Sequence, residues 1–113
     1  PRCFMVINTV PIFTVGKGSY LQTLIELAGG ENAADLKTPY GQYDAEALVA
    51  ADPDLIVTDR FSGVNAMLTR APWNALRAVR LHRVFLAPDA LWHPGPRYND
   101  GLAWLIARFR VVP

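Results

Sequence analysis

Apolar residues follow two patterns along the chain, and the two patterns alternate. Some form short continuous runs rich in valine and isoleucine, which are typical of buried strands. Others recur every three or four residues, as Leu21, Leu24 and Ala28 do, and indicate the buried face of a helix. The first pattern predicts strands at residues 3–10, 54–59 and 83–87, with a short edge strand near 32–34. The second predicts helices at 19–30, 44–53, 62–79 and 97–109.

Capping and breaking residues support these helix boundaries. Ser19 and Asp44 stand where a side-chain oxygen can accept a hydrogen bond from the first turn of the following helix. Pro53 stops the second predicted helix, and Pro72 breaks the third. Pro96 lies near the start of the last helix, where its fixed φ angle is favourable.

The alternation of helices with strands that are apolar throughout predicts an α/β fold. We expect a single Rossmann-like lobe, in which a mainly parallel sheet of about four strands carries helices on both faces. Ligands of such sheets bind outside the carboxyl ends of the strands. Three predicted loops leave these ends, at residues 9–18, 59–63 and 88–96. Their larger side chains are Phe13, Lys17, Arg60, Phe61, Asp89, Trp92 and His93.

The composition and the absence of certain motifs argue against several classes of function. The 113 residues suffice for one domain, and a net charge of +1 gives no electrostatic reason to expect nucleic acid as a partner. A phosphate-binding loop is disfavoured because Ile12 occupies the position where its first glycine would stand. His82 and His93 have no acidic residue spaced to complete a metal site, and the single Cys3 excludes an internal disulfide. Since no nucleophile motif is present either, we expect no catalytic residue, no metal site and no enzyme.

Four segments occur in the order and spacing of a known family. They read "GKGSYLQTLIELAGGENAA", "DAEALVAADPDLIV", "PWNALRAVRLHRVFLAPD" and "PGPRYNDGLAWL". Through them the chain resembles the carboxyl-terminal lobe of class III periplasmic substrate-binding proteins, which serve ABC importers for cobalamin, ferric siderophores and haem. The segments "VPIFTVGKGS" and "PDALWHPGPR" are most similar to the cobalamin-binding members.

The resemblance implies a position in a larger protein. Family members have two lobes joined by a long helix, and the ligand binds between the lobes. Residues 1–113 would form the carboxyl-terminal lobe, so we expect the amino-terminal lobe and the linker helix to lie outside this chain. The implied protein is periplasmic or otherwise extracytoplasmic, and the full-length form could be a membrane-anchored lipoprotein. It would need no intrinsic cofactor and would deliver cobalamin or a ferric chelate to the membrane subunits of an ABC transporter.

The resemblance also assigns roles to particular residues. Phe13 matches an aromatic residue that touches the ligand in cobalamin binders, and Tyr40 stands where the family has a tryptophan-type ring. Asp89 matches an acid that reaches the corrin side chains, whereas His93 replaces an arginine, and Trp92 adds a ring. The predicted ligand contacts are therefore Phe13, Tyr40, Arg60, Asp89, Trp92 and His93.

These residues also have structural interpretations. Phe13 could be a core residue, Tyr40 a turn aromatic, and Asp89 the first residue of an Asx turn. The remaining tryptophans, Trp73 and Trp104, are expected to pack in the core or between helices.

Glu46 lies in the first turn of a predicted helix, where the helix dipole favours an acid. In the family, the glutamate at this position docks onto arginines of the transporter's membrane subunits.

An alternative function belongs to a different class. The chain could be a small α/β interaction module that self-associates through an exposed face.

Overall fold

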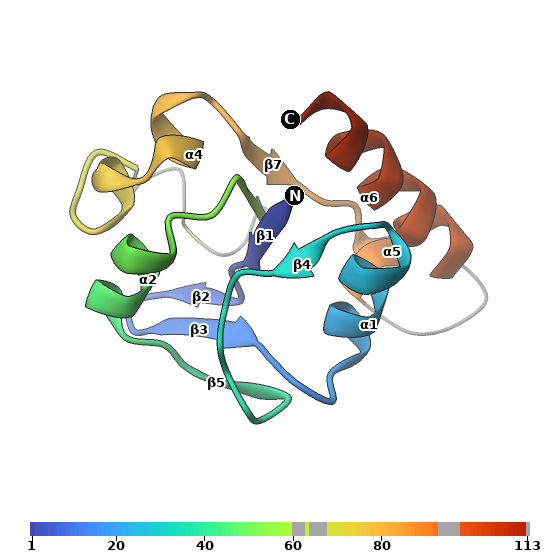
Figure 1. The fold of residues 1–113 in the computed structure, drawn as a ribbon, viewed down its shortest axis with the longest axis horizontal. Helices are drawn as coiled ribbons and strands as arrows, with labels where there is room; N and C mark the ends of the chain where they lie inside the picture. The colour runs from blue at the N-terminus through green and yellow to red at the C-terminus, as the bar shows by residue number, and fades with distance from the viewer. Residues whose placement is uncertain (60–62, 64–67, 93–97, 113) are drawn as a thin grey trace.

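A four-stranded parallel sheet forms the centre of the fold in the computed structural model, which describes residues 1–59, 63, 68–92 and 98–112 (Figure 1). Its strands lie in the order β4-β1-β6-β7, and every neighbouring pair runs parallel. The strands are β1 (Arg2–Met5), β4 (Glu31–Asn32), β6 (Leu55–Thr58) and β7 (Val84–Leu86). The predicted strands at 54–59 and 83–87 and the short edge strand are thereby confirmed, whereas the predicted strand at 3–10 belongs to this sheet only over residues 3–5.

Helices cover both faces of this sheet, as predicted (Figure 1). Side chains of α1, α5 and α6 pack against one face, and those of α2, η1 and α4 against the other. The helices are α1 (Tyr20–Leu27), α2 (Ala45–Ala51), η1 (Trp73–Ala75), α4 (Arg77–Arg80), α5 (Asp89–Trp92) and α6 (Tyr98–Val111). None of the helices in the described part of the chain has both the length and the apolar character of a membrane span.

Side chains of β1 and of Val6, which follows it, alternate between two apolar clusters. Cys3 and Met5 belong to the cluster under α1 and α6, whereas Phe4 and Val6 belong to the cluster under α2. All four are at most 1% exposed, and complete burial of a large apolar side chain contributes roughly 1.5–3 kcal/mol. The central strand therefore holds both layers of helices in place.

The predicted helix caps and packing tryptophans are confirmed. Ser19 Oγ accepts a hydrogen bond of 3.0 Å from Gln22 N, and Asp44 Oδ2 accepts one of 3.0 Å from Ala47 N. Trp73 is fully buried, and Trp104 of α6 is half-buried against the first cluster.

The prediction that residues 9–18 form a loop is wrong for residues 12–15, because a strand of a second sheet lies there. The strands β2 (Asn8–Thr9), β3 (Ile12–Val15) and β5 (Tyr40–Gln42) are antiparallel and lie in the order β2-β3-β5. The predicted strand 3–10 is likewise divided into β1 and β2. Residues of β3 alternate between buried Ile12, exposed Phe13 and buried Thr14, which is the pattern of a half-buried strand.

Two further predictions need correction. Residues 88–96 were expected to be loop, but Asp89–Trp92 form the short helix α5, because the apolar Ala90 and Leu91 are buried against the sheet. The single interrupted helix expected at 62–79 consists, within its described part, of the short helices η1 and α4. Residues 60–62, 64–67 and 93–97 lie outside the described residues.

Arg77 joins α4 to the segment before β6 through an ion-pair cluster at the amino edge of the sheet. Its Nε lies 2.7 Å from Asp52 Oδ2, and its Nη2 lies 3.1 Å from Asp54 Oδ1. Partial burial raises the pKa of the Asp52 carboxyl, but the hydrogen bonds and the positive charge of Arg77 outweigh this effect and lower the pKa below its usual value. The cluster therefore stabilises the fold while Asp52 is ionised.

We expect Arg77→Ala to lower the midpoint of thermal unfolding at neutral pH by about 2–4 °C, as is usual for a partly exposed ion pair in a domain of this size. Because the folded-state pKa of Asp52 is depressed, the stabilisation is complete above the ordinary pKa of 3.8. It is lost as the pH falls through the depressed pKa. Calorimetric scans from pH 7 downwards should therefore show the difference between Arg77→Ala and the wild type shrinking, while Arg70→Ala should unfold like the wild type throughout.

Candidate functional site

Phe13 and Tyr40 lie on the same face of the β2-β3-β5 sheet. In the register of this sheet, Phe13 pairs with Gln42 and Val15 pairs with Tyr40, so the two rings occupy diagonal positions on neighbouring strands. Phe13 is 36% exposed and Tyr40 is 58% exposed. The interpretation of Phe13 as a core residue is therefore wrong, and Tyr40 belongs to a strand rather than to a turn. The structure thus brings two predicted ligand contacts together on an exposed aromatic face.

Gly16 allows the chain to place Tyr40 beside β3. Gly16 N donates a hydrogen bond of 2.9 Å to Pro39 O, and Lys17 N donates one of 2.9 Å to Leu36 O. A side chain at position 16 would collide with the carbonyl oxygens of Leu36 and Thr38. Since only glycine permits this close approach, the end of β3 fixes the course of residues 36–39, which lead directly into β5.

The small sheet is attached at the carboxyl end of β1. Thr14 Oγ1 donates a hydrogen bond to Met5 O, the last residue of β1, and Ile7 N donates one of 2.9 Å to Phe13 O. Both partners of the first bond are fully buried, so the bond is protected from water. The hairpin of β2 and β3 therefore stands at the edge where ligands of parallel sheets bind.

The segment after β6 reaches the same edge. Thr58, the last residue of β6, donates from its Oγ1 to Val6 O at 3.1 Å. Further along, a side chain built at Gly63 would lie 3.8 Å from Thr9 Oγ1 of β2. The prediction that the segments 9–18 and 59–63 share one edge is thus confirmed for these residues. Arg60 itself lies outside the described residues.

The segment after β7 carries Asp89 at the carboxyl end of the third strand. Asp89 is exposed in the first turn of α5 and helps to line a pocket of about 340 Å³. The other described residues around this pocket are Leu86, Ala87 and Pro88. Because β6 and β7 are parallel, this pocket opens at the same edge as the aromatic face.

Trp92, at the end of α5, is only half exposed to solvent. Its ring packs against the apolar cluster under α1 and α6, and its Nε1 is buried without a hydrogen-bond partner among the described residues. Part of the ring thus anchors α5, and its role as a wall of the ligand site stays a prediction. His93, the other predicted wall residue, lies outside the described residues.

Glu46 lies in the first turn of α2 and is exposed. Its carboxylate has no hydrogen-bond or ion-pair partner within the described ranges. The expected geometry of a docking residue, an exposed acid at a helix amino terminus, is therefore present, although the helix dipole alone would also favour an acid here.

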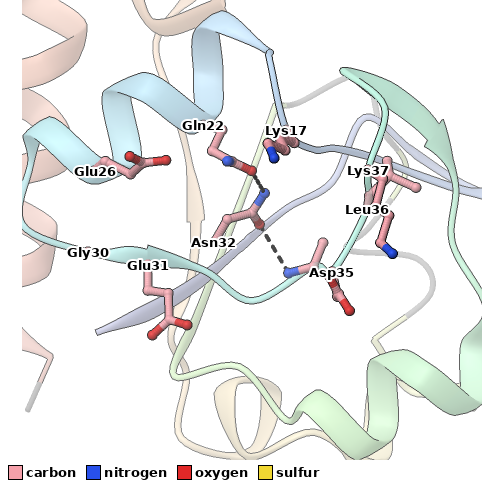
Figure 2. A pocket seen from close by; sticks show the side chains of 10 residues that line it. Lys17, Gln22, Glu26, Gly30, Glu31, Asn32, Asp35, Leu36 and Lys37 are labelled. Atoms are coloured by element: carbon pink, nitrogen blue, oxygen red, sulfur yellow. Dashed lines mark hydrogen bonds between the residues drawn. The ribbon is translucent and has the colours of Figure 1, made fainter.

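A second hollow of about 590 Å³ lies between α1 and β4 (Figure 2). Asn32 holds its walls together, since its Nδ2 donates to Gln22 Oε1 at 2.9 Å and to Val15 O at 3.0 Å, while its Oδ1 accepts from Ala34 N at 3.1 Å. Sequence analysis missed this pocket because its residues come from separate segments and form no motif. They are Lys17, Gln22, Glu26, Gly30, Glu31, Asn32, Ala34, Asp35, Leu36 and Lys37.

The chemistry of the edge is that of a binding surface with aromatic, amide and carboxylate groups. Within the described ranges, no three histidine, cysteine or acidic side chains are grouped so that they could hold a metal ion. Burial raises the pKa of the Cys3 thiol far above its usual value, so this group is not a thiolate at neutral pH.

The sequence of the chain is similar to sequences of known substrate-binding proteins. No family model matches the chain. It is 34% identical to a vitamin B12-binding protein of Vibrio cholerae over 98% of its own length, and 41% identical to a cobalamin-binding protein of Halobacterium salinarum over 86%. It is also 34% identical, over 80%, to the uncharacterised ABC transporter substrate-binding lipoprotein YvrC of Bacillus subtilis. The chain covers 41%, 29% and 29% of these three relatives, respectively.

Solved structures show the same relationship. The periplasmic vitamin B12-binding protein BtuF of Vibrio cholerae superposes with a TM-score of 0.84 at 28% identity, over 97% of this chain and 44% of BtuF. The periplasmic haem-binding protein BhuT, in complex with two haems, superposes with a TM-score of 0.82 at 28% identity, over 96% of this chain and 43% of BhuT. The chain therefore matches, in sequence and in fold, one lobe of the class III substrate-binding proteins of ABC importers, which confirms the resemblance seen in its motifs.

Proposed function

We propose that the chain is the carboxyl-terminal lobe of an extracytoplasmic solute-binding protein that captures cobalamin, or a related metal chelate, for an ABC importer. The observation that carries the proposal is the exposed pair Phe13 and Tyr40 at the carboxyl edge of the parallel sheet. Two aromatic side chains on one rigid face offer a surface that suits a flat, conjugated ligand. The names of the relatives, which include vitamin B12-binding and haem-binding proteins, support ligands of this kind.

The proposed mechanism is non-covalent capture followed by delivery. A ligand would rest on the aromatic face, with Asp89 and Trp92 at its side and a second lobe closing over it. A single lobe offers only half of such a cleft, so it should bind weakly, since tight pockets bury most of the surface of their ligand. No reaction is assigned to the chain, and no intrinsic cofactor is needed.

Ferric siderophores and haem are the alternative ligands within the same family. A screen of the two-lobed protein by titration calorimetry tests all three, with cyanocobalamin, haemin and a ferric hydroxamate as probes. We expect saturable binding of at least one of them at micromolar concentration or below. Failure of all three to bind would contradict the proposed function.

A self-associating interaction module is the second candidate, and a specific observation favours it. The hairpin of β2 and β3 exposes apolar side chains, with Ile7, Val10 and Phe13 exposed by 38%, 68% and 36%. Exposed apolar surface of this kind tends to find a partner. Size-exclusion chromatography of the isolated lobe separates the candidates, because a dimer that forms independently of cobalamin would favour the interaction module.

We further propose that Glu46 docks the protein onto arginines of the transporter's membrane subunits. In a transport assay, Glu46→Gln should reduce uptake by about tenfold, as expected for the loss of one charge-assisted hydrogen bond at an interface. Its ligand affinity should stay within about twofold of the wild type, since surface substitutions outside a site usually have small effects. Glu26→Gln is the matched control on α1. Normal uptake by Glu46→Gln would exclude the docking role.

A further inference from the structure

The side chain of Phe13 is flanked by two carboxamides. In the register of the small sheet, Asn8 of β2 pairs with Phe13 on one side, and Gln42 of β5 pairs with Phe13 on the other. Side chains that pair across antiparallel strands point to the same face, with Cβ atoms about 5 Å apart. The row Asn8–Phe13–Gln42, which we call the amide row, therefore crosses the aromatic face with a ring between two amides.

Hydrogen-bonding groups of the amide row remain available. Asn8 Nδ2 donates to Pro11 O at 3.0 Å, which fixes the amide and leaves its Oδ1 as an acceptor. Gln42 is exposed, and neither end of its amide has a partner among the described residues. The row can therefore offer at least one fixed acceptor and a free amide group, which both donates and accepts.

No charge accompanies these amides on the small sheet. The strands β2, β3 and β5 contain no acidic or basic residue. The nearby lysines Lys17 and Lys37 line the separate pocket beside β4. Asp44, which follows β5, accepts the capping hydrogen bond of α2. Ligand carboxylates would thus meet no countercharge from these strands, whereas ligand carboxamides would find neutral partners of matching geometry.

Resting on the proposed function, we infer that the amide row selects a flat metal macrocycle whose rim carries carboxamides rather than carboxylates. Phe13 would contact the ring system, while Asn8 and Gln42 would pair with amide groups at its rim. A corrin ring carries such amides, whereas haem carries carboxylates in the form of propionates. The row therefore favours a corrinoid over haem within the family, and it assigns specificity to two residues that no motif had indicated.

Titration calorimetry on the two-lobed protein tests this inference with cyanocobalamin, a cyanocobalamin derivative in which one amide is hydrolysed to a carboxylate, and haemin. The wild type should bind cyanocobalamin most tightly. Asn8→Ala removes the fixed acceptor of the row, whereas Gln42→Glu removes the amide donor and keeps an acceptor. Each should weaken cyanocobalamin binding by about three- to tenfold, the value of one neutral hydrogen bond. Gln42→Glu should weaken binding of the carboxylate derivative more strongly than binding of cyanocobalamin, because two like charges would then meet. The thermal midpoint of Gln42→Glu should match the wild type, since Gln42 is exposed. Asn8→Ala also loses the hydrogen bond from Asn8 Nδ2 to Pro11 O, so a thermal scan must show that this variant is folded before its affinity is compared.

Gln22→Glu is the matched control, because Gln22 lies on α1 and a carboxylate there can still accept the hydrogen bond from Asn32. If cyanocobalamin binds equally well to Gln42→Glu, Asn8→Ala, the control and the wild type, the amide row has no role and only the proposed function survives. Tighter binding of haemin than of cyanocobalamin would overturn the inference in the same way. Failure of the wild type to bind any of these ligands, and the ferric hydroxamate as well, would instead contradict the proposed function itself.

Discussion

Alanine at position 16 should destabilise the lobe by about 2–3 kcal/mol, which is the usual cost of forcing extra atoms into a packed site. The new Cβ would collide with two backbone carbonyl oxygens and would lie 2.7 Å from Leu36 Cβ. Backbone atoms cannot rotate away as a flexible side chain can, so residues 36–39 would have to move. The movement would also strain the hydrogen bonds from Gly16 N to Pro39 O and from Lys17 N to Leu36 O.

Equilibrium denaturation of Gly16→Ala measures this cost, and Gly41→Ala is its matched control. Gly41 lies in β5, opposite Thr14, and a Cβ there would come no closer than 3.3 Å to the flexible side chain of Thr38. We expect Gly41→Ala to unfold within about 0.5 kcal/mol of the wild type, as a tolerated surface substitution does. Equal stabilities for the two variants would show that residues 36–39 do not depend on the contact with Gly16.

The central sheet and its helices could be predicted because their signals are local. The strand β6 begins with the apolar run Leu55, Ile56 and Val57, since both of its faces are covered. Ser19 and Asp44 cap helices that follow immediately in sequence. The boundaries were less exact, since residues 3–10 read as one strand although the chain turns after Val6 to form β2. Local pattern shows which residues are buried but not where a strand changes its partner.

The second sheet could not be predicted, because its strands are short and its pairing is long-range. β2 has two residues and β5 contains Tyr40, Gly41 and Gln42, so neither shows enough alternation to be recognised. The position of β5 depends on a contact between Gly16 and residues 36–39, about twenty positions along the chain. Phe13 and Tyr40 were identified one by one through a family resemblance, whereas their common face follows only from the register of β3 and β5.

The aromatic face should supply the largest part of the ligand affinity. Combining Phe13→Ala with Tyr40→Ala in the two-lobed protein should weaken cyanocobalamin binding by about 2–4 kcal/mol, because truncation of a buried interface aromatic usually costs 1–3 kcal/mol and neighbouring contacts are not additive. The reason is geometric, since both rings project from one rigid sheet and need little ordering when a flat ligand arrives. Each single variant should lose less than the pair.

Stability measurements must accompany this test. Phe13 and Tyr40 are 36% and 58% exposed, so their removal should change the free energy of unfolding much less than it changes binding. Trp73→Ala is a control that should lose stability, because removal of a fully buried ring should lower the free energy of unfolding by about 3–5 kcal/mol. If the double variant bound cyanocobalamin as tightly as the wild type while remaining folded, the ligand would have to rest elsewhere. The pocket of Asp89 beside β7 would then be the next surface to test, since it opens at the same edge of the sheet.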